Sequence, residues 1–385
     1  MERASDYDGG QCDPACKPLR LYYTHVYPFK ALFLWLNHGV APTSLFTKRE
    51  FAMKLSNGRL IRRQFFQTVE QLQKRLCQCG ATRFEIGAIY DDPPVAQSSF
   101  SAPQRLRKEF VIDIDITAYD DIRTCCTGKR ICRRCWGFLA AAINVLEASL
   151  RLQFGYKSIL WVFSGQRGVH CWVSDDSAIE LKDAHRHAAL GWLDVLKNAK
   201  GLKTSPAIRR SADLNSPLHP MIRFATSKIP CNFNQLILTT QDAFAWEDRW
   251  RCLLGKLSGG SLFQSSLAAA WEAEPERCSL DKWDDILAEA KDLPGYVSRP
   301  RRIGLQKSME DMVLQCMYPR LDVQVSRRSE HLLKAPFCVH PDTGRICVPI
   351  DPSTVEEFNP DSVPTLTDIL EEISTSQGEP GCLGR

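Results

Sequence analysis

The sequence predicts a mixed α/β (α+β) fold in which a sheet-containing module carries a helical insertion. Three observations lead to this expectation: strand-like patterns recur within residues 49–173, helical periodicity dominates residues 177–318, and strand-like patterns return at residues 320–325 and 345–350. The simplest interpretation is that the last strands rejoin the sheet formed by the first ones.

The N-terminal part begins with helices and continues into strands. Residues 1–17 are polar, without the apolar stretch of a secretory signal, so we expect a flexible leader. The aromatic-rich residues 19–39 predict helices. Residues 49–66 predict two strands around an Asn-Gly turn, which is a strong hairpin signal, and residues 84–90 predict a further short strand.

Residues 110–116 alternate as a β-strand does, so that isoleucines occupy one face while Asp113 and Asp115 share the other. The elements expected after this strand are, in order, a helix at 136–154, strands at 159–163 and 169–173, helices at 177–198 and 261–292, and a basic loop at 299–302. We expect the core of the helical part to contain Trp192, Trp246, Trp250 and Trp271.

The composition is that of a soluble globular protein, with 44% hydrophobic and 24% charged residues among 385. No apolar run approaches the ~20 residues that a membrane-spanning helix needs, so we expect no membrane contact. The net charge of +4 averages two unlike regions: residues 351–385 hold eight acidic residues and one basic residue, and residues 1–350 carry a net charge of +11. A basic body suits a nucleic-acid template and triphosphates, and the acidic end is expected to be a flexible tail.

The two aspartates of the alternating strand predict a metal site. Two carboxylates side by side repel each other unless a cation lies between them, and carboxylate oxygens are ligands for an Mg²⁺ or Mn²⁺ ion that also holds substrate phosphates. Asp322, in the strand predicted at residues 320–325, is a third candidate. The alternative is that Asp113 and Asp115 merely lie on a solvent-exposed face of the sheet, although the apolar flanks indicate a buried strand.

Four of the sixteen cysteines lie within eleven residues: Cys125, Cys126, Cys132 and Cys135. Four thiolates complete the tetrahedral shell of Zn²⁺ and leave no open position, so the cluster predicts a structural rather than a catalytic zinc. The alternative is a chance cluster in a Cys-rich chain, although this density is far above the background. Most of the other cysteines are interpreted as small buried hydrophobic residues.

The turn between the two strands that follow the helix is glycine-flanked, and Gly165 and Gly168 allow the backbone to approach a ligand closely. Ser164, Arg167 and His170 can donate hydrogen bonds to phosphate oxygens there, as the binding of a triphosphate requires. Taken alone, His170 is better explained as an ordinary hydrogen-bonded strand histidine.

Several longer motifs occur in order along the chain: FVIDIDI, YDDIRTCC, ICRRCW, LWVFSGQRGVHCWV, YPRLDVQVS and HLLKAPFCVHPDTGRICVPID. In sequence and order they resemble the small, catalytic subunit of eukaryotic and archaeal-type DNA primase, which belongs to the primase-polymerase superfamily. The resemblance spans about residues 19–351, apart from the helical insertion.

The resemblance implies a primase-polymerase fold of mixed and antiparallel sheets around the active site, with a zinc-binding loop and a helical subdomain. It also implies synthesis of short RNA primers from ribonucleoside triphosphates on a single-stranded DNA template during replication, by two-metal nucleotidyl transfer. Asp113, Asp115 and Asp322 would be the catalytic carboxylates that bind Mg²⁺ or Mn²⁺, and the four clustered cysteines would be the zinc ligands. The nucleotide-binding residues that it implies are Ser164, Arg167, His170, Arg62, His331, Lys334 and Glu50.

Two residues depart from the family pattern. Gln166 stands where many eukaryotic members have an arginine, which removes one positive charge near the phosphates. Leu60 stands where an aromatic residue is often found. These departures affect the expected triphosphate affinity rather than the chemistry.

The resemblance further implies partners and a location. We expect a heterodimer with a large primase subunit that carries an iron–sulfur cluster, association with the DNA polymerase alpha complex, and a nuclear location at the replication fork. The expected domains are a flexible leader (1–17), a catalytic module (18–176) with the zinc motif (125–135), a mainly helical subdomain (177–318), C-terminal strands completing the catalytic module (319–350) and an acidic tail (351–385).

Three other functions would use some of the same residues. A damage-tolerance primase-polymerase would share the carboxylates and the basic turn but would prefer deoxynucleotides and act alone. A metal-dependent nuclease would also use the carboxylates. A non-catalytic zinc module that only binds nucleic acid would not need Asp113, Asp115 and Asp322 together.

Overall fold

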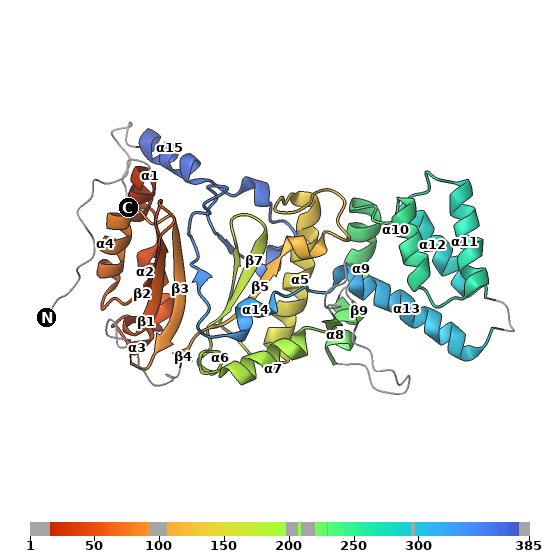
Figure 1. Cartoon of the computed structure of the whole chain (residues 1–385), viewed down its shortest axis with the longest axis horizontal. Coiled ribbons are helices and arrows are strands. Elements are labelled where there is room, and N and C mark those ends of the chain that lie inside the picture. Colours follow the sequence, from red (N-terminus) through yellow and green to blue (C-terminus); the bar gives the residue numbers. More distant parts are fainter. Residues whose placement is uncertain are drawn as a thin grey trace.

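A computed structural model of the chain describes residues 16–92, 106–197, 207–208, 220–228, 230–293 and 297–376. A first sheet, a second sheet and a group of helices follow one another along the long axis of an elongated molecule (Figure 1). The predicted mixed α+β fold class is thereby confirmed. The leader predicted at residues 1–17 lies outside the described residues except for Cys16 and Lys17, of which Lys17 begins helix α1.

The first sheet is antiparallel and has the strand order β10-β3-β1-β2, with β4 also paired to β3. Its strands are β1 (Arg49–Lys54), β2 (Leu60–Gln64), β3 (Arg83–Tyr90), β4 (Leu106–Arg107) and β10 (Leu333–Lys334). Strands β1 and β2 form the predicted hairpin, in which Lys54 pairs with Leu60. Gly58 takes the left-handed conformation (φ +82°) that makes glycine favourable in this turn.

The helices that accompany this sheet are α1 (Lys17–His25), α2 (Phe29–Asn37), α3 (Ser44–Thr47) and α4 (Val69–Cys79) (Figure 1). The helices predicted at residues 19–39 are therefore confirmed. Aromatic side chains fill the core between helices and sheet, where the rings of Phe51 and Phe84 stack at 5.7 Å and Tyr27 lies edge-on to Phe84. Burial of rings of this size contributes strongly to the stability of the layer.

The second sheet is also antiparallel, with the strand order β11-β6-β7-β5. Its strands are β5 (Phe110–Asp115), β6 (Ile159–Phe163), β7 (Gly168–Val173) and β11 (Pro349–Ile350). Helix α5 (Arg133–Leu152) packs on one face of this sheet. By length and composition α5 is apolar enough to cross a membrane, contrary to the expectation that no such run exists, but 67% of its most apolar stretch is buried in the protein, as in a core helix.

The alternation in β5 decides which way its aspartates face. Ile112 and Ile114 belong to the core under α5, whereas Val111 packs with Trp172 in the core that the second sheet shares with the first. Because side chains two residues apart share a face of a strand, Asp113 and Asp115 lie on the same side as Val111. They therefore face the first sheet rather than the core under α5.

The returning C-terminal strands do not rejoin a single sheet, as the sequence suggested. Strand β10 pairs with β3 in the first sheet, whereas β11 pairs with β6 in the second. Of the strand predicted at residues 345–350, only Pro349–Ile350 forms a named strand, and Ile346 makes an isolated bridge with Val339. The returning segment therefore connects the two sheets.

The strand predicted at residues 320–325 is wrong. Val323–Arg327 is the short helix α14 instead, and Asp322 is its N-cap residue. The Asp322 side chain accepts a hydrogen bond from the backbone N–H of Gln324 (3.0 Å), which satisfies a donor that would otherwise be unpaired at the start of the helix.

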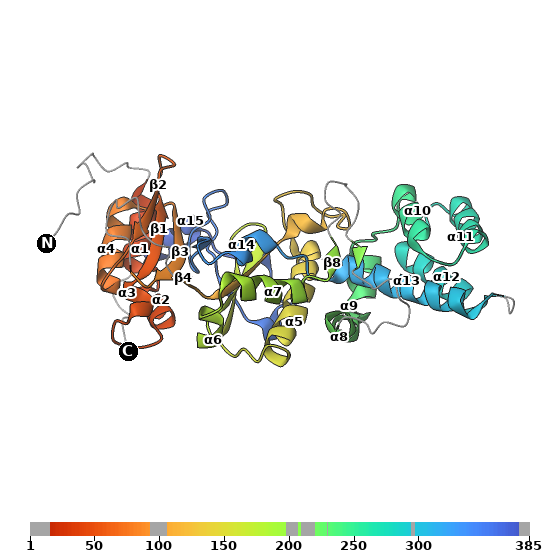
Figure 2. The ribbon, with the colours of Figure 1, turned by 60° about the horizontal axis from the view of Figure 1, so that its bottom comes forward.

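Most of the helical region lies at the opposite end of the molecule from the first sheet (Figures 1 and 2). Its elements are α6 (Asp176–Ile179), α7 (Asp183–Leu193), β8 (Leu196–Lys197), β9 (Ala207–Ile208), α8 (Pro220–Lys228), α9 (Pro230–Phe233), a π-helical segment (Asn234–Thr240), α10 (Glu247–Lys256), α11 (Ser261–Ala273), α12 (Ser279–Lys291) and α13 (Arg299–Met317). The helices predicted at 177–198 and 261–292 are thus each broken by a turn. The basic loop predicted at 299–302 is wrong, because these residues form the first turn of α13, where a helix tolerates Pro300.

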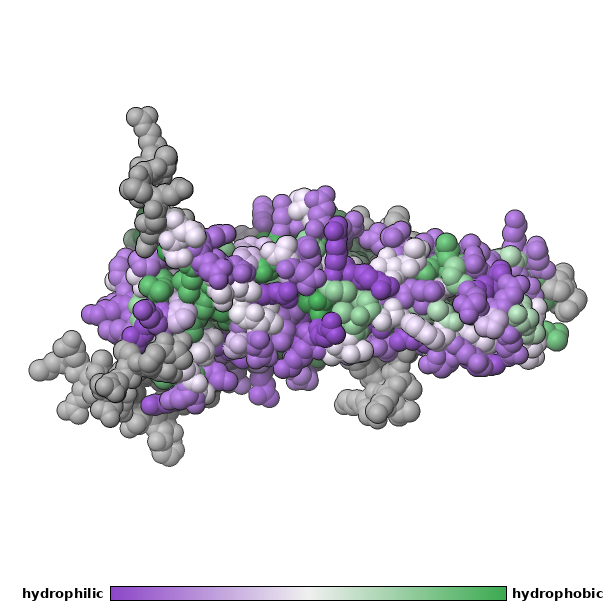
Figure 3. Space-filling view, turned by 90° about the horizontal axis from the view of Figure 1, so that it is seen from above, coloured by the Kyte–Doolittle hydropathy of each residue, from purple (hydrophilic) through white to green (hydrophobic). Residues whose placement is uncertain are grey.

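Two of the four tryptophans expected in the helical core are there. The rings of Trp250 and Trp271 are both buried and meet at 5.4 Å in a T-shaped arrangement. The prediction is wrong for Trp192 and Trp246, which are 37% and 54% exposed. The face of the molecule in Figure 3 is mainly hydrophilic, with small apolar patches between the charged side chains.

The acidic C-terminal segment is more ordered than the flexible tail predicted at residues 351–385. Two 3₁₀ turns (Pro352–Thr354 and Pro360–Ser362) lead to helix α15 (Leu366–Ser376), which packs against α1. Val355 is buried in the core, and its carbonyl accepts a hydrogen bond from the Trp136 indole (2.7 Å). The tail prediction is therefore corrected for residues 351–376, whereas residues 377–385 lie outside the described residues.

Candidate active site

Three carboxylates predicted from the sequence come together between the sheets. Asp113 and Asp115 lie two residues apart on β5, and Asp322 precedes α14. The backbone N–H of Asp322 donates a hydrogen bond to the backbone carbonyl of Asp113 (2.9 Å), so the two segments are held edge to edge although more than 200 residues separate them. The structure therefore places the third aspartate beside the first.

The electrostatics of this group match the needs of a cation site. Burial, followed by the negative charges of Asp322 and Asp115, raises the pKa of Asp113 to about 7. A carboxyl that resists ionisation because two others lie close by is stabilised in its charged form when a cation binds among them. The oxygen donors are those that Mg²⁺ and Mn²⁺ prefer, so the residues fit a divalent-metal site.

The glycine-flanked turn approaches these carboxylates through backbone pairing. Gly168 on β7 lies opposite Asp115, and a Cβ atom at position 168 would lie 2.4 Å from the carbonyl oxygen of Ile114. Only glycine fits there. Its N–H donates to the Ser164 hydroxyl (3.0 Å), and the neighbouring Arg167 Nε lies 2.6 Å from Asp115 Oδ2. The turn therefore brings a guanidinium directly to the second aspartate.

His170 lies opposite Asp113 in the same pair of strands, with its Nε2 3.8 Å from Asp113 Oδ1. Burial, followed by the charge of Lys334, lowers the pKa of His170 to about 3, so its imidazole is neutral at physiological pH. The Lys334 ammonium donates to the Ser164 carbonyl (3.0 Å) and thereby joins β10 to the turn. His170 and Lys334 thus contribute one neutral and one charged donor.

A polar cavity of about 370 Å³ lies at this place. Of the residues predicted from sequence, those that line it are Asp113, Asp115, Ser164, Arg167, His170, His331 and Lys334. Asp322 is not among the lining residues of the cavity. Its backbone N–H bonds to the backbone carbonyl of Asp113, which does line the cavity, as does Val325 of the helix α14 that Asp322 caps. Gln166, which stands where many family members have an arginine, also lines the cavity, and its amide Nε2 lies 3.4 Å from Asp342 Oδ2.

Two predicted nucleotide contacts do not line the cavity. Glu50 on β1 is fully buried and pairs with Arg62 on β2, with Arg62 Nε 3.0 Å from Glu50 Oε1. The Tyr90 hydroxyl also donates to Glu50 (2.9 Å). In this structure the ion pair between Glu50 and Arg62 links β1 to β2 in the first sheet. Leu60, which stands where family members often have an aromatic residue, is exposed at the start of β2.

The four clustered cysteines form a compact set of sulfur donors, with their Sγ atoms all within 4.8 Å of one another. The Sγ atom of Cys132 lies 3.7 Å from that of Cys125 and 3.8 Å from that of Cys135. Tetrahedral zinc with bonds of ~2.3 Å needs sulfur–sulfur separations of roughly 3.8 Å. The cluster therefore fits a closed tetrahedral metal site.

A buried arginine supports this loop from inside. Arg123 is 1% exposed and donates to the carbonyls of Gly128 (2.5 Å) and Arg130 (2.7 Å). Gln241, which directly follows the π-helical segment, donates to Cys125 Sγ (3.5 Å) and so adds an outer contact to the cluster. The cysteine loop is therefore held from within by Arg123 and joined to the helical region by Gln241.

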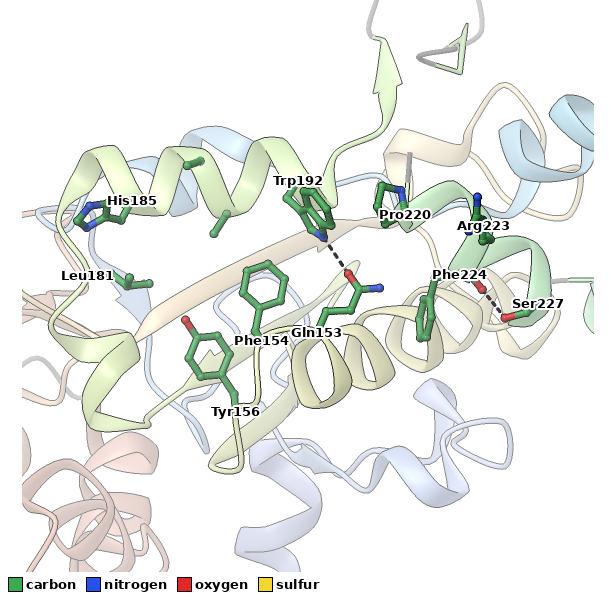
Figure 4. A pocket seen from close by; sticks show the side chains of 12 residues that line it. Gln153, Phe154, Tyr156, Leu181, His185, Trp192, Pro220, Arg223, Phe224 and Ser227 are labelled. Atoms are coloured by element: carbon green, nitrogen blue, oxygen red, sulfur yellow. Dashed lines mark hydrogen bonds between the residues drawn. The ribbon is translucent and has the colours of Figure 1, made fainter. Parts of the chain in front are cut away.

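A larger cavity of about 1270 Å³ lies elsewhere, between α5, α7 and α8 (Figure 4). Aromatic and aliphatic side chains line most of it, including Phe154, Tyr156 and Phe224. The Trp192 indole donates across it to Gln153 (2.8 Å). None of the predicted site residues lines it, so size alone does not identify the reactive site.

Comparison with known proteins identifies the family to which the chain belongs. The sequence profile of the DNA primase small subunit family matches residues 112–352. The DNA primase small subunit of Schizosaccharomyces pombe is 41% identical over 94% of this chain and 78% of its own length. Those of Saccharomyces cerevisiae (39%, covering 94% and 86%) and Drosophila melanogaster (32%, covering 92% and 81%) are also similar. The chain belongs to the DNA primase small subunit family.

The sequence-based prediction of a primase catalytic subunit is thereby confirmed. The profile match includes all three aspartates and all four clustered cysteines of this primase subunit. It also runs through the helical insertion, where the sequence motifs had shown little resemblance.

Several residues of the primase cavity escaped the sequence analysis. They are Lys54, Arg83, Lys129, His340 and Asp342. His340 and Asp342 lie in the HPDTG stretch, where the turn signal offered a clue. Lys54 and Arg83 are register partners across β1 and β3, which no local pattern indicates. Lys129 belongs to the cysteine loop and pairs with Asp342 (Nζ to Oδ2, 3.3 Å), so this loop reaches the cavity mouth.

Proposed function

We propose that this primase subunit synthesises short RNA primers on single-stranded DNA by two-metal nucleotidyl transfer from ribonucleoside triphosphates. The observation that supports it most is the convergence of Asp113, Asp115 and Asp322 beside a cavity rich in cationic side chains. Carboxylates for metals and cations for phosphates are the two components that phosphoryl transfer needs.

The three aspartates would hold two Mg²⁺ or Mn²⁺ ions. When bound, such ions activate the attacking 3′-hydroxyl and neutralise charge on the leaving pyrophosphate. Asp113 must then be ionised, and Asp322, held to the Asp113 backbone, contributes a carboxylate from a separate segment. This arrangement ties the geometry of the metal site to correct packing of α14 on β5.

The cavity side chains would bind the triphosphate. Arg167 offers further N–H groups beyond the Nε that Asp115 accepts, and Lys334 offers an ammonium held against the turn. Neutral His170 can donate a hydrogen bond without adding charge. Ser164 and His331 complete the cavity wall, and we add His340 and Arg83 to the proposed phosphate contacts because they line the same space. The roles of Arg62 and Glu50 remain proposals that rest on the family resemblance.

We propose that Zn²⁺ occupies the cysteine cluster in a structural role. The four-sulfur shell, which leaves no open coordination position for a substrate, favours this assignment. We also propose that residues 18–176 and 319–350 make up the catalytic module and that residues 177–318 form a mainly helical subdomain.

The partners proposed for this subunit are a large primase subunit with an iron–sulfur cluster and the DNA polymerase alpha complex, in the nucleus. Initiation from two free nucleotides needs both to be held on the template at once, without binding energy from a primer. The carboxylate cavity of about 370 Å³ is small for that task, which favours a second subunit. Among the described residues, one cluster of four cysteines is present, and we assign it to zinc, so the iron–sulfur cluster is proposed to belong to the large subunit.

A primer-synthesis assay on single-stranded DNA tests the proposal, with and without the large subunit and with either ribonucleotides or deoxynucleotides. We expect ribonucleotide products that require Mg²⁺ or Mn²⁺, that increase with the large subunit and that disappear in Asp113→Asn. A preference for deoxynucleotides by the subunit alone would instead assign a damage-tolerance polymerase. Strand cleavage with Mn²⁺ would assign a nuclease, and full activity in Asp113→Asn would exclude the carboxylate mechanism.

A further inference from the structure

Among the residues that the structure describes, Lys108 is buried without an ion pair to a carboxylate, and it contacts a segment that lines the proposed active site. Lys108 lies two residues before β5 and is 1% exposed. Its sequence neighbour Glu109 is engaged by Arg49 through two hydrogen bonds of 2.8 Å and is therefore neutralised elsewhere. Burial lowers the pKa of Lys108 to about 7. A buried ammonium of this kind needs an explanation.

The Lys108 ammonium has two contacts among the described residues. It donates a hydrogen bond to the backbone carbonyl of His331, and it lies 5.8 Å from the centre of the Trp172 ring. Trp172 is in β7 and pairs with Val111 of β5, so this end of the contact belongs to the second sheet. His331 precedes β10, which belongs to the first sheet. Lys108 thus joins the two sheets through a segment that lines the cavity.

The segment whose backbone Lys108 contacts, His331 to Lys334, contributes side chains to the wall of the cavity. The side chain of His331 lines the cavity, and Lys334, three residues later, lines it and donates to the Ser164 carbonyl. The paired stretch between β10 and β3 is short, with Leu333 opposite Ile86 and Lys334 opposite Glu85. So short a strand has few ladder hydrogen bonds of its own, and the contact at His331 adds an anchor just before it.

We propose that Lys108 is a positioning residue for nucleotide binding, which sets the place of the His331–Lys334 segment through its hydrogen bond to the His331 carbonyl. This inference rests on the proposed function, because it takes that segment as part of the triphosphate site. Lys108 itself does not line the cavity. Its removal should therefore weaken nucleotide binding while leaving the carboxylates on β5 in place.

The helical region provides a matched control. Lys282 on α12 is 0% exposed and donates to the backbone carbonyls of Phe244 (3.2 Å) and Ala245 (2.9 Å). It is thus another buried lysine that holds backbone carbonyls, but it lies far from the cavity along the chain and contacts none of the cavity residues. Any general cost of replacing such a lysine should appear in both positions.

The experiment compares Lys108→Met and Lys282→Met in the complex with the large subunit, measuring KM for ribonucleotide, kcat and thermal stability. Methionine keeps the length of the side chain and removes the donor. For Lys108→Met we expect a KM about tenfold higher, with kcat within about twofold of the wild type. For Lys282→Met we expect a similar loss of stability and an unchanged KM. A KM within twofold of the wild type in Lys108→Met, or the same KM increase in both variants, overturns the proposal.

Lys108→Gln provides a second variant if the methionine does not fold, because glutamine is polar but too short to make the same contact. We expect the same increase in KM. Loss of the folded state in both Lys108 variants would assign the residue to stability alone and overturn the positioning role. Asp113→Asn in the same assay separates a failure of the proposed function from a failure of the positioning role. If Asp113→Asn is inactive while Lys108→Met has a normal KM, only the positioning role fails. If it is active, the proposed function itself fails.

Discussion

The backbone N–H of Asp322 donates to the backbone carbonyl of Asp113, at 2.9 Å, and this contact joins two segments that lie more than 200 residues apart along the chain. It brings the third carboxylate to the other two without any sheet pairing at Asp322. The same residue caps α14 with its side chain (3.0 Å to the Gln324 N–H). The carboxylate of Asp322 thus has a structural role in the absence of metal, and its orientation is set before a cation binds.

Replacing Asp113 should separate activity from stability. Because the folded-state pKa of Asp113 is about 7, well above its ordinary value of 3.8, the folded protein favours the protonated carboxyl. The stability that this proton contributes is present at low pH and is lost as the pH rises through 7. Asp113→Asn should therefore abolish primer synthesis and yet raise the melting temperature of the metal-free protein at pH 8 by about 2 °C or more.

The matched measurement is the same pair of melting curves at pH 5, where Asp113 is protonated in the folded protein but largely ionised in the unfolded chain, with its ordinary pKa of 3.8. There the difference between the melting temperatures of the wild type and Asp113→Asn should be clearly smaller than at pH 8, and it should vanish only below the unfolded-state pKa. A variant that is destabilised equally at both pH values would show that the carboxylate group does not carry the repulsion described here.

The affinity for the divalent ion should depend on pH in the opposite sense. A cation binds the ionised carboxylates, so it must displace the proton of Asp113, whose pKa is about 7. Mn²⁺ should bind about tenfold more weakly at pH 6 than at pH 8, as followed by electron paramagnetic resonance or calorimetry. In Asp113→Asn both the affinity and its pH dependence should fall. An affinity independent of pH in the wild type would contradict this account.

Replacing one cysteine should remove the structural metal. Cys132→Ser deletes the sulfur that lies 3.7 Å and 3.8 Å from two of the others, which leaves an incomplete tetrahedral shell. Elemental analysis should show about one zinc per chain in the wild type and little in the variant, and the melting temperature should fall by several degrees. Cys252→Ser, at an exposed cysteine outside the cluster, should change neither quantity. Equal zinc content in both variants would place the metal elsewhere.

The cysteine loop should also influence nucleotide binding through Lys129. Its ammonium lies 3.3 Å from Asp342 at the cavity mouth, and both side chains are more than half exposed. Lys129→Ala should raise KM for ribonucleotide by about two- to fivefold at low salt, as expected for an exposed charge. Asp342→Asn should act in the opposite direction, because it frees the lysine charge. Both effects should shrink at high salt, and changes of the same sign in the two variants would count against a charge mechanism.

Much of the fold was predictable because its signals are local. The alternation of residues 110–116, the Asn-Gly hairpin and the long helix α5 follow from periods of two and 3.6 residues that neighbouring side chains impose. Errors arose where long-range contacts outweigh these patterns. The apolar residues around Asp322 have a strand-like pattern, but the backbone N–H of Asp322 bonds to Asp113 of β5, and the side chain of Asp322 caps a helix that starts there instead.

The site was predictable to a similar degree. Two aspartates on one strand face and four cysteines within eleven residues indicate metal chemistry by residue type and spacing alone, and the longer motifs identify the family. Tertiary structure decided that β10 and β11 join different sheets, that Asp322 meets Asp113, that Lys129 reaches Asp342 and that Lys108 holds His331. These contacts join residues up to more than 200 positions apart, and their formation depends on how whole layers pack. Spacing along the chain carries no information about such packing, whereas it determines which side chains share a face wherever a strand forms, as it does at Asp113 and Asp115.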